Sequence, residues 1–283
     1  MRRRPFGNTR RKAPVIGQGT WRLDEGDRAS AVRALRRGLD LGLDHIDTAE
    51  MYGDAELMVG EAVEGRREEV LLVSKVLPGN ATRAGVAAAC ERSLRRLATD
   101  YLDAYLLHWR GGIPLAETVQ GFEDLRAAGK ILWWGVSNFD VGDLDDLAKA
   151  TAGAGSPGGP VCNQVLYHLE ERAIEHALLA RCEEAEMAVV GYSPFGHGRF
   201  PPPGSPGGEV LARIAAVHGA APRQVALAFL TRKAPLFAIP KAASPDHAIE
   251  NAGAGDLILS AGEITMIDRA FPRGARPRSL PMI

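Results

Sequence analysis

The residues His45-Ile46-Asp47-Thr48-Ala49-Glu50-Met51-Tyr52-Gly53 decide the expected fold, because a short apolar strand leads here into side chains that transfer protons. The strand is expected over residues 43–46, after a helical segment with amphipathic spacing. An Asp at a strand end and a Tyr shortly after it are costly to bury in a hydrophobic core. They are typical of the open end of a parallel barrel, where strand ends converge on one pocket. Taken alone, a helix-capping Asp and a packing Tyr explain the stretch equally well.

The composition is that of a globular protein, with 46% hydrophobic residues, enough for a sizeable core. A net charge of −1 gives no support for a nucleic-acid partner or an anionic membrane surface. No apolar run approaches membrane-spanning length. The three cysteines have no metal-ligand spacing, which indicates reduced thiols in a cytoplasmic protein and no metal site. The basic residues 1–5 lack the apolar stretch of a secretory signal and are expected to form an arm or a hairpin.

Short β-like runs alternate with helical runs through the whole chain. Strands are expected over residues 15–20, 43–46, 70–76, 102–107, 131–136, 161–165, 187–191 and 236–239. Helices are expected over residues 27–41, 55–63, 82–98, 113–128, 140–150, 171–184, 209–218, 222–233, 244–253 and 261–270. The Gly/Pro-rich segment 151–160 is predicted to be a surface loop, and 196–208 a flap over a ligand.

This alternation predicts an α/β fold with a parallel sheet covered by helices. Eight strand–helix units fit a closed (β/α)8 TIM barrel, here one domain over residues 1–283 with a short N-terminal hairpin and two extra helices. The rival fold is an open doubly wound sheet. If it bound a dinucleotide, it would carry a G-x-G-x-x-G turn after its first strand. Here Gly17 and Gly19 are not followed by a third glycine three residues further on.

Groups that can bind or react stand at the end of every expected strand. Each has a plain alternative, such as a surface Lys or a packed His, but a barrel brings all of them to one mouth. They are Trp21, Asp47 with Tyr52, Lys75, His108 with Trp109, Ser137 with Asn138, Gln164, Tyr192 with Ser193, and Lys241.

Four of these groups can deliver a proton to a carbonyl oxygen. A Lys75 ammonium about 4 Å from Tyr52 is worth about 4 kcal/mol at an effective dielectric of ~20, which would lower the phenol pKa by roughly two to three units. Asp47 keeps that ammonium charged, and His108 aligns the carbonyl oxygen by a hydrogen bond. None of these groups supplies a hydride, so a cofactor is required.

The chain resembles the aldo-keto reductase family over nearly its whole length. The resemblance rests on Gly19-Thr20-Trp21, the stretch 45–53, Ser74-Lys75, Leu106-Leu107-His108-Trp109, Gly135-Val136-Ser137-Asn138-Phe139, Asn163-Gln164, Gly191-Tyr192-Ser193-Pro194, and Ile239-Pro240-Lys241 with Glu250-Asn251. It implies a (β/α)8 barrel in which NADPH reduces an aldehyde or ketone. It also implies a catalytic tetrad of Asp47, Tyr52, Lys75 and His108, with Tyr52 as the general acid.

The resemblance further implies where the cofactor and substrate bind. Amide and hydroxyl groups hold the nicotinamide carboxamide, an aromatic ring stacks on the nicotinamide, and a Lys beside a helix N-terminus binds phosphate. The implied cofactor residues are Gly19, Thr20, Trp21, Asp47, Ser137, Asn138, Gln164, Tyr192, Ser193, Phe195, Lys241, Ser244, His247, Glu250 and Asn251. The implied substrate residues are Trp21, Tyr52, His108 and Trp109.

One position departs from the family pattern, which usually has an Arg where this chain has His247. A guanidinium is always charged, whereas a free His charges only below about pH 6.5. Lys241 still favours NADPH, with NADH as a weaker alternative.

The physiological substrate is open. The tail after residue 271 is short, so a relatively open pocket is expected, suited to small aldehydes, dicarbonyls or sugar-like carbonyls. The resemblance favours a monomer. Two other functions are considered: a non-catalytic cofactor-binding barrel, as in channel β-subunits, and a Schiff-base lyase acting through Lys75. No role for Glu50 follows from the sequence.

Overall fold

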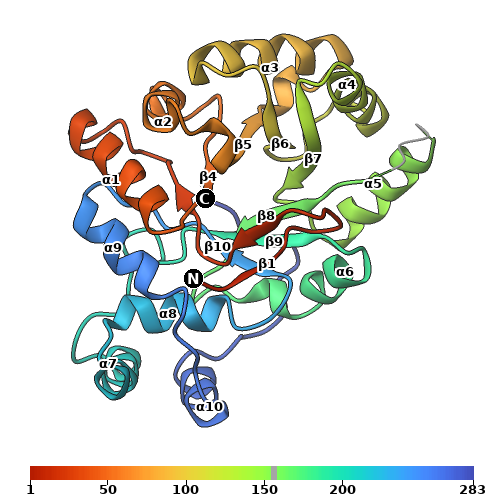
Figure 1. Ribbon diagram of the computed structural model, residues 1–283. Helices are drawn as coiled ribbons and strands as arrows, with labels where there is room; N and C mark the ends of the chain where they lie inside the picture. The colour runs from red at the N-terminus through yellow and green to blue at the C-terminus, as the bar shows by residue number, and fades with distance from the viewer. Residues whose placement is uncertain (154–157) are drawn as a thin grey trace.

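The computed structural model describes residues 1–153 and 158–283. In these ranges, eight parallel strands form one sheet in chain order. Bridges from Ile16 to Ala238 and from Gly19 to Lys241 join its two edges, so the sheet closes into the expected (β/α)8 barrel (Figure 1). Its strands are β3 (Gln18–Gly19), β4 (His45–Asp47), β5 (Leu71–Val76), β6 (Leu102–Leu107), β7 (Ile131–Ser137), β8 (Cys162–Leu166), β9 (Ala188–Tyr192) and β10 (Leu236–Ala238).

The barrel closes where backbone approaches backbone most closely. β3 is shorter than the expected strand 15–20, and its partner across the seam is the segment after β10. A Cβ atom on Gly19 would lie 2.5 Å from the carbonyl oxygen of Ile239. Only glycine therefore fits at this point of the seam.

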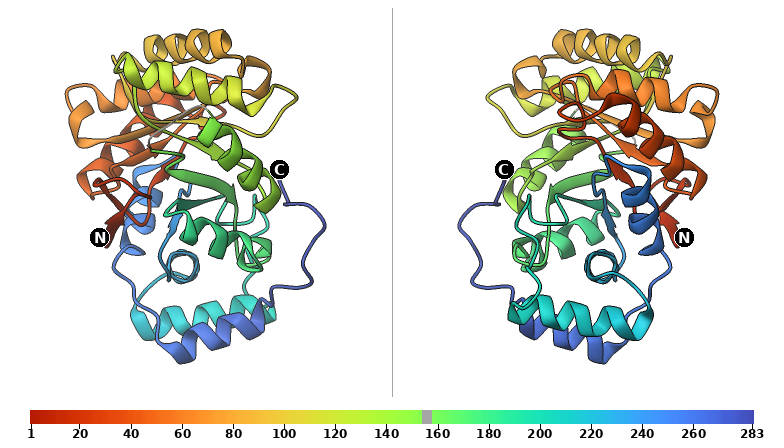
Figure 2. Two further views of the ribbon diagram at one scale, coloured as in Figure 1. Left: turned by 90° about the vertical axis from the view of Figure 1, so that its right-hand side faces the viewer. Right: turned by 90° about the vertical axis from the view of Figure 1, so that its left-hand side faces the viewer.

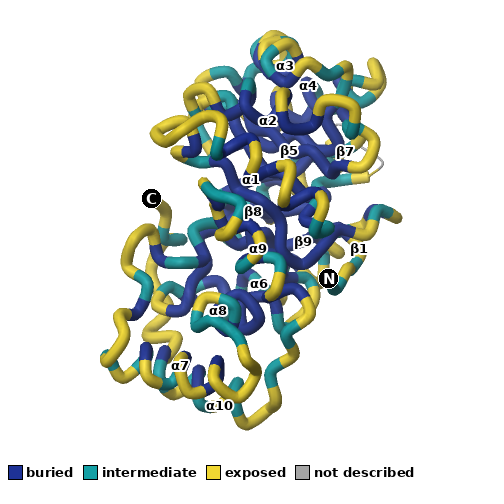
Figure 3. Tube along the Cα trace, turned by 60° about the vertical axis from the view of Figure 1, so that its left-hand side comes forward, coloured by how far each residue is buried: buried dark blue, intermediate teal, exposed yellow. Residues whose placement is uncertain are grey.

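Helices surround the barrel, as Figure 1 shows. They are α1 (Arg28–Asp40), α2 (Ala55–Val63), α3 (Arg83–Leu97), α4 (Leu115–Ala127), α5 (Val141–Gly153), α6 (Leu178–Glu184), α7 (Pro206–His218), α8 (Pro222–Leu230), α9 (Pro245–Gly253) and α10 (Ala261–Ala270). Helices α7 and α10 are the two extra ones and lie side by side outside the ring (Figure 2). Figure 3 shows the buried chain at the centre and exposed segments outside.

Several expected boundaries were wrong. Helix α7 begins at Pro206 with Ser205 as its N-cap, so the irregular segment expected over 196–208 ends earlier, consistent with proline's preference for the first helical turn. The helix expected over 171–184 is a 3-10 turn, Ala173–Glu175, followed by α6. The loop expected over 151–160 loses its first three residues to α5, and residues 154–157 lie outside the described residues.

The N-terminal hairpin closes one end of the barrel. Strands β1 (Arg3–Pro5) and β2 (Lys12–Pro14) pair antiparallel. The fully buried Phe6 beside them meets His45 and Phe237 edge-on, with ring centroids 5.3 and 5.4 Å apart. Figure 2 shows the two chain ends on opposite sides of the molecule.

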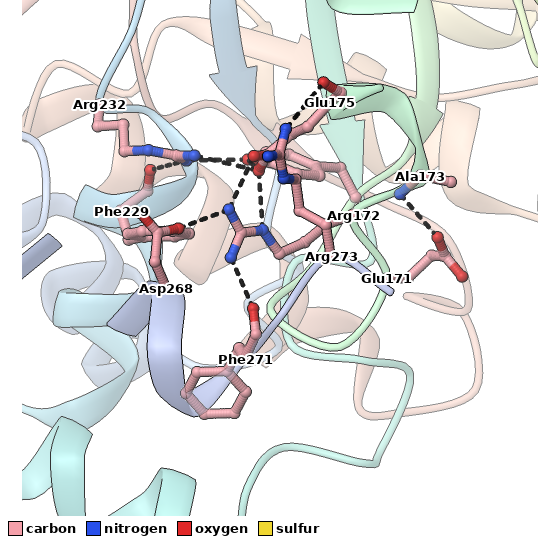
Figure 4. A network of polar contacts seen from close by, with 10 residues as sticks. Glu171, Arg172, Ala173, Glu175, Phe229, Arg232, Asp268, Phe271 and Arg273 are labelled. Carbon is pink, nitrogen blue, oxygen red and sulfur yellow. Dashed lines mark hydrogen bonds and ion pairs between the residues drawn. The ribbon is translucent and has the colours of Figure 1, made fainter. Parts of the chain in front are cut away.

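A buried ion cluster fixes the end of α10 (Figure 4). Arg172 contacts Glu175 and Asp268, both at 2.7 Å, and donates to the carbonyl oxygen of Phe271 at 2.6 Å. Burial would raise the pKa of Glu175, but hydrogen bonds from Arg172 and Tyr167 and the charges of the nearby arginines bring it down to about 2. The cluster therefore fixes the point where the C-terminal tail, residues 272–283, leaves the fold.

Candidate active site

The two-residue repeat of the strands brings the predicted tetrad inside the barrel. On β5, Lys75 shares the inner face with Leu71 and Val73, whereas Leu72 and Val76 pack against the helices. By the same alternation, Asp47 on β4 and the residue after β6, His108, face inward. The tetrad thus lies at the carboxyl ends of the strands, as the barrel requires.

The four tetrad side chains are in contact. The Lys75 ammonium donates to Asp47 Oδ1 at 2.5 Å, to the Thr48 carbonyl at 2.8 Å and to the Tyr52 hydroxyl at 3.4 Å. The rings of Tyr52 and His108 meet edge-on, with centroids 5.6 Å apart. Asp47 and Lys75 are only 1% and 0% exposed, so both charges sit in a low-dielectric environment.

The electrostatics of the tetrad correct one prediction. Burial would lower the pKa of Lys75, but Asp47 and Tyr52 raise it, so the expected role of Asp47 in keeping the ammonium charged agrees with the structure. Burial also raises the pKa of the Tyr52 phenol, and the ammonium opposes this only in part. The predicted net lowering of the Tyr52 pKa was therefore wrong, because it omitted desolvation and the nearby Asp47 charge.

His108 is a neutral imidazole. Burial, with a smaller contribution from the Lys75 charge, lowers its pKa to about 2. Its backbone N–H donates to Val76 and its carbonyl accepts from Asn138. Nδ1 is buried, and none of the described residues offers it a hydrogen-bond partner. A neutral ring can orient an oxygen by a hydrogen bond without competing as an acid.

A cavity of about 630 Å³ opens over the tetrad. Most of the predicted site residues line it: Gly19, Thr20, Trp21, Asp47, Tyr52, His108, Trp109, Ser137, Asn138, Gln164, Tyr192, Ser193, Phe195 and Lys241. It is also lined by residues that the sequence did not indicate, including Arg22, Glu25, Met51 and Ile283, and by His197, which lies in the segment 196–208 that was expected to form a flap. Lys75 lies behind this wall, in contact with Asp47 and Tyr52.

One wall of the cavity is a network of amides and hydroxyls. Asn138, with a left-handed φ of 60°, donates to the Ser137 hydroxyl at 3.2 Å and accepts from the Tyr192 hydroxyl at 2.9 Å. Ser137 donates to the backbone carbonyl of Gln164. Burial raises the pKa of Tyr192 to about 12, against a backbone hydrogen bond with Ile283. The wall is therefore pre-organised and presents a neutral aromatic ring.

The remaining predicted residues lie on α9, outside the lining of this cavity. Ser244 caps the helix by accepting from the backbone N–H of His247 at 3.4 Å, and the His247 side chain is exposed. Glu250 is half-buried and Asn251 is buried on the same helix. Lys241, which does line the cavity, precedes this helix and donates to the Arg22 carbonyl at 3.2 Å.

Two contacts at the cavity involve irregular segments, one of them the segment 196–208 that was expected to form a flap, but the contacting residues themselves were not predicted. The Trp21 ring stacks on His197 across the mouth, with centroids 4.8 Å apart and planes 22° apart. His197 itself has a left-handed φ of 52° between two glycines. The tail also returns to the barrel, so Ile283 lines the cavity. The short tail therefore contributes to the cavity wall.

Glu50 has a structural role next to the tetrad. Its carboxylate accepts from the backbone N–H of Leu77 at 2.7 Å and from the Asn80 side chain at 3.0 Å. It also pairs with Arg92 at 3.1 Å. Glu50 therefore holds the turn that follows β5, directly after Lys75.

Comparison with known proteins agrees with this geometry. Residues 15–271 match the model of the aldo/keto reductase family. The chain belongs to the aldo-keto reductase family. Among curated relatives, methylglyoxal reductase YeaE of Escherichia coli K12 is 46% identical over 276 residues, covering 95% of each chain. Glyoxal reductase of Bacillus subtilis is 32% identical, covering 90% of this aldo-keto reductase and 88% of the relative.

Solved structures show the same fold. An aldo/keto reductase from Klebsiella pneumoniae, in complex with NADP and acetate, superposes with a TM-score of 0.91 at 45% identity, covering 98% of each chain. A second Klebsiella pneumoniae structure, in complex with NADPH, has a TM-score of 0.91 at 44% identity and covers both chains completely.

Proposed function

We propose that this aldo-keto reductase transfers hydride from NADPH to an aldehyde or ketone, with Tyr52 donating the proton. The observation that carries the proposal is the Tyr52 phenol on the cavity wall, within 3.4 Å of the Lys75 ammonium and edge-on to His108. Relatives solved with NADP and NADPH at 44–45% identity support the cofactor.

The residues present fit a nicotinamide cofactor. Ser137, Asn138 and Gln164 offer amide and hydroxyl groups along one wall, beside the flat ring of Tyr192. Lys241 precedes the N-terminus of α9, where Ser244 is the N-cap, and such a helix end attracts phosphate. When bound, NADPH supplies the hydride that no side chain in this site can supply.

The tetrad supplies the proton of the reduction. The Tyr52 hydroxyl donates to the carbonyl oxygen as negative charge develops there. The Lys75 ammonium stabilises the phenolate that remains, and Asp47 keeps that ammonium charged. Neutral His108 orients the oxygen by a hydrogen bond. In alcohol oxidation the same phenol accepts the proton.

The two other functions gain no support. A Schiff-base lyase needs an accessible and neutral lysine. Lys75 is 0% exposed, and its pKa is raised by Asp47 and Tyr52, which outweigh burial. The relatives reported above are reductases by name, and nothing among them favours a channel subunit.

We propose small 2-oxoaldehydes as the substrate class. The names of two relatives, methylglyoxal reductase and glyoxal reductase, support this class. The pocket is compatible with it, since Trp21, Trp109 and Ile283 provide apolar walls beside the tetrad.

The test is oxidation of NADPH, followed by absorbance, with methylglyoxal, glyoxal, simple aldehydes, sugars and ketosteroids. We expect turnover with the 2-oxoaldehydes and a loss of about 10²–10⁴-fold in Tyr52→Phe, the usual range for a general acid. NADPH binding by fluorescence should be unchanged in that variant. No turnover with any carbonyl compound, or full activity of Tyr52→Phe, would contradict the proposal.

We further propose that residues 1–283 act as one cytoplasmic domain and as a monomer. The return of the tail to the cavity supports one domain, and three buried free cysteines suit a reducing compartment. In the described part of the chain, no helix is long and apolar enough to cross a bilayer. Sedimentation of the purified protein would test the oligomeric state.

A further inference from the structure

The carboxylate of Asp47 is held by two donors from different strands. Lys75 on β5 donates to Oδ1 at 2.5 Å, and the Gln164 amide on β8 donates to Oδ2 at 2.7 Å. Both contacts are buried, since Gln164 is only 2% exposed. Placing Oε1 of Gln164 on the carboxylate instead would set two acceptors against each other, so the amide orientation is determined.

This amide matters because Gln164, Asp47 and Lys75 are all buried, and Lys75 in turn contacts the half-buried Tyr52. Burial raises the pKa of Asp47, while Lys75 and the Gln164 hydrogen bond oppose that rise. Asp47 in turn is the main group that holds Lys75 charged against burial. The ammonium is the main influence that lowers the pKa of the Tyr52 phenol, against the larger effect of burial. Loss of one hydrogen-bond donor to Asp47 therefore changes the pKa of the Tyr52 phenol as well.

Gln164 also faces the cavity on its other side. Its side chain lines the cavity next to Ser137 and Asn138, and none of the described residues donates to its Oε1. The same amide can therefore contact a bound cofactor through Oε1 while its Nε2 stays on Asp47.

We propose that Gln164 is a positioning residue for proton transfer, which fixes the ionised state of the Asp47–Lys75 pair and so tunes Tyr52. This inference rests on the proposed function and assigns Gln164 a second role beside contact with the cofactor. It predicts that removing the amide donor moves the proton from Lys75 to Asp47. The phenol then loses its neighbouring positive charge, and its proton becomes harder to remove.

The deciding variant is Gln164→Met, which keeps an unbranched chain of similar length but has no donor. We expect the acidic limb of the pH profile for alcohol oxidation with NADP to shift upward by about one unit or more, with kcat falling more than KM rises. Ser137→Ala is the matched control, because Ser137 lines the same wall but does not contact Asp47. It should raise KM for NADPH and leave the pH profile in place.

Gln164→Glu gives a rescue that a purely structural role would not give. A protonated carboxyl at this position donates to Asp47, whereas an ionised one repels it, since neighbouring carboxyls share one proton. We expect the activity of this variant to recover as the pH is lowered from 8 to 5, relative to wild type. If Gln164→Met does not fold, as judged by circular dichroism, this variant carries the test.

A readout without turnover separates this inference from the proposed function. Phenolate formation by Tyr52 can be followed by ultraviolet difference absorbance, with Tyr52→Phe subtracted in each background. We expect titration at higher pH in Gln164→Met than in wild type. Superimposable titrations and pH profiles, with only KM for NADPH changed, would overturn the inference. An inactive wild type in which the titration still shifts would instead contradict the proposed function alone.

Discussion

Replacing Asp47 with Asn tests the buried ion pair on which the tetrad depends. The variant keeps the shape of the side chain but removes the partner of an ammonium that is 0% exposed. Burial, the largest influence on Lys75, is then opposed mainly by Tyr52, and the pKa of Lys75 falls. We expect Lys75 to fold as the neutral amine in Asp47→Asn.

The size of the effect follows from proton counting. A free Lys titrates at roughly 10.4, and each pH unit is worth about 1.4 kcal/mol, so deprotonation on folding costs about 4.6 kcal/mol at pH 7 and about 1.9 at pH 9. The cost at pH 7 agrees with the roughly 3–5 kcal/mol that is lost when a buried ion pair is broken. The stability deficit of the variant should therefore shrink by about 2.7 kcal/mol between pH 7 and pH 9.

The pH dependence of the variant differs from that of the wild-type pair. In wild type the raised Lys75 pKa gives stability that is present below the unfolded pKa and lost only above it. The pair binds one proton in both states from pH 7 to pH 9, so its contribution is flat there. In Asp47→Asn the unfolded state binds one proton more than the folded state, so stability rises with pH.

The assay is urea unfolding of wild type and variant at several pH values from 7 to 9. Asp124→Asn is the matched control, because it removes the partner of Arg83 in a pair with side chains 57% and 49% exposed. We expect a small change in that control, independent of pH. A deficit for Asp47→Asn that stays constant across the range, or equals that of the control, would refute a charged Lys75 held by Asp47.

Three further predictions concern the histidines. Burial lowers the pKa of His45 to about 3, and its ring nitrogens have no partner among the described residues, so wild type loses stability as the pH falls below about 6.5. Urea unfolding should therefore show that the free energy of unfolding of His45→Leu, relative to wild type, rises by about 2 kcal/mol from pH 8 to pH 5. A difference between the two proteins that is the same at both pH values would argue against a neutral buried ring. His197→Ala removes the stack on Trp21 and should speed NADPH release in stopped-flow fluorescence by roughly 2–13-fold, the equivalent of about 0.5–1.5 kcal/mol for a ring pair. An unchanged release rate would show that this stack does not help to retain the cofactor. An imidazole lacks the fixed charge of a guanidinium, so His247→Arg should raise the ratio of kcat/KM for NADPH over NADH, and an unchanged ratio would exclude this position as a determinant of cofactor preference.

The sequence predicted the barrel and the tetrad because both depend on local pattern. Strand alternation points every second side chain into the barrel. The side chain of a polar residue at the end of an apolar strand, such as Lys75 or Gln164, therefore lies inside the barrel at its carboxyl end. Parallel strands then bring these ends together whatever their separation along the chain. Asn163, the neighbour of Gln164 on the same strand, faces outward by the same alternation and donates to the Phe139 carbonyl at 2.8 Å.

The mouth of the cavity was not predictable in the same way. His197 and Ile283 belong to irregular segments, whose direction depends on contacts with distant residues and not on a repeat. The tail reaches the cavity from Phe271, which Arg172 holds through its carbonyl oxygen. Arg172 lies about a hundred residues earlier, in a stretch whose spacing predicted an ordinary helix. The start of α7 could have been predicted from the sequence, since Ser205 before Pro206 is a common helix start.

The raised pKa of Tyr52 changes how the tetrad is understood. Arithmetic with one cation at a surface-like dielectric predicted an acidified phenol, but the folded site also removes water and places Asp47 nearby. A phenol that keeps its proton at neutral pH is fully protonated and ready to act as the proton donor. An alkoxide is basic enough to take that proton once hydride has been transferred. The same property works against alcohol oxidation, which needs the phenolate. The site therefore favours reduction near neutral pH, and the rate of alcohol oxidation should reach its maximum at a more alkaline pH than that of carbonyl reduction.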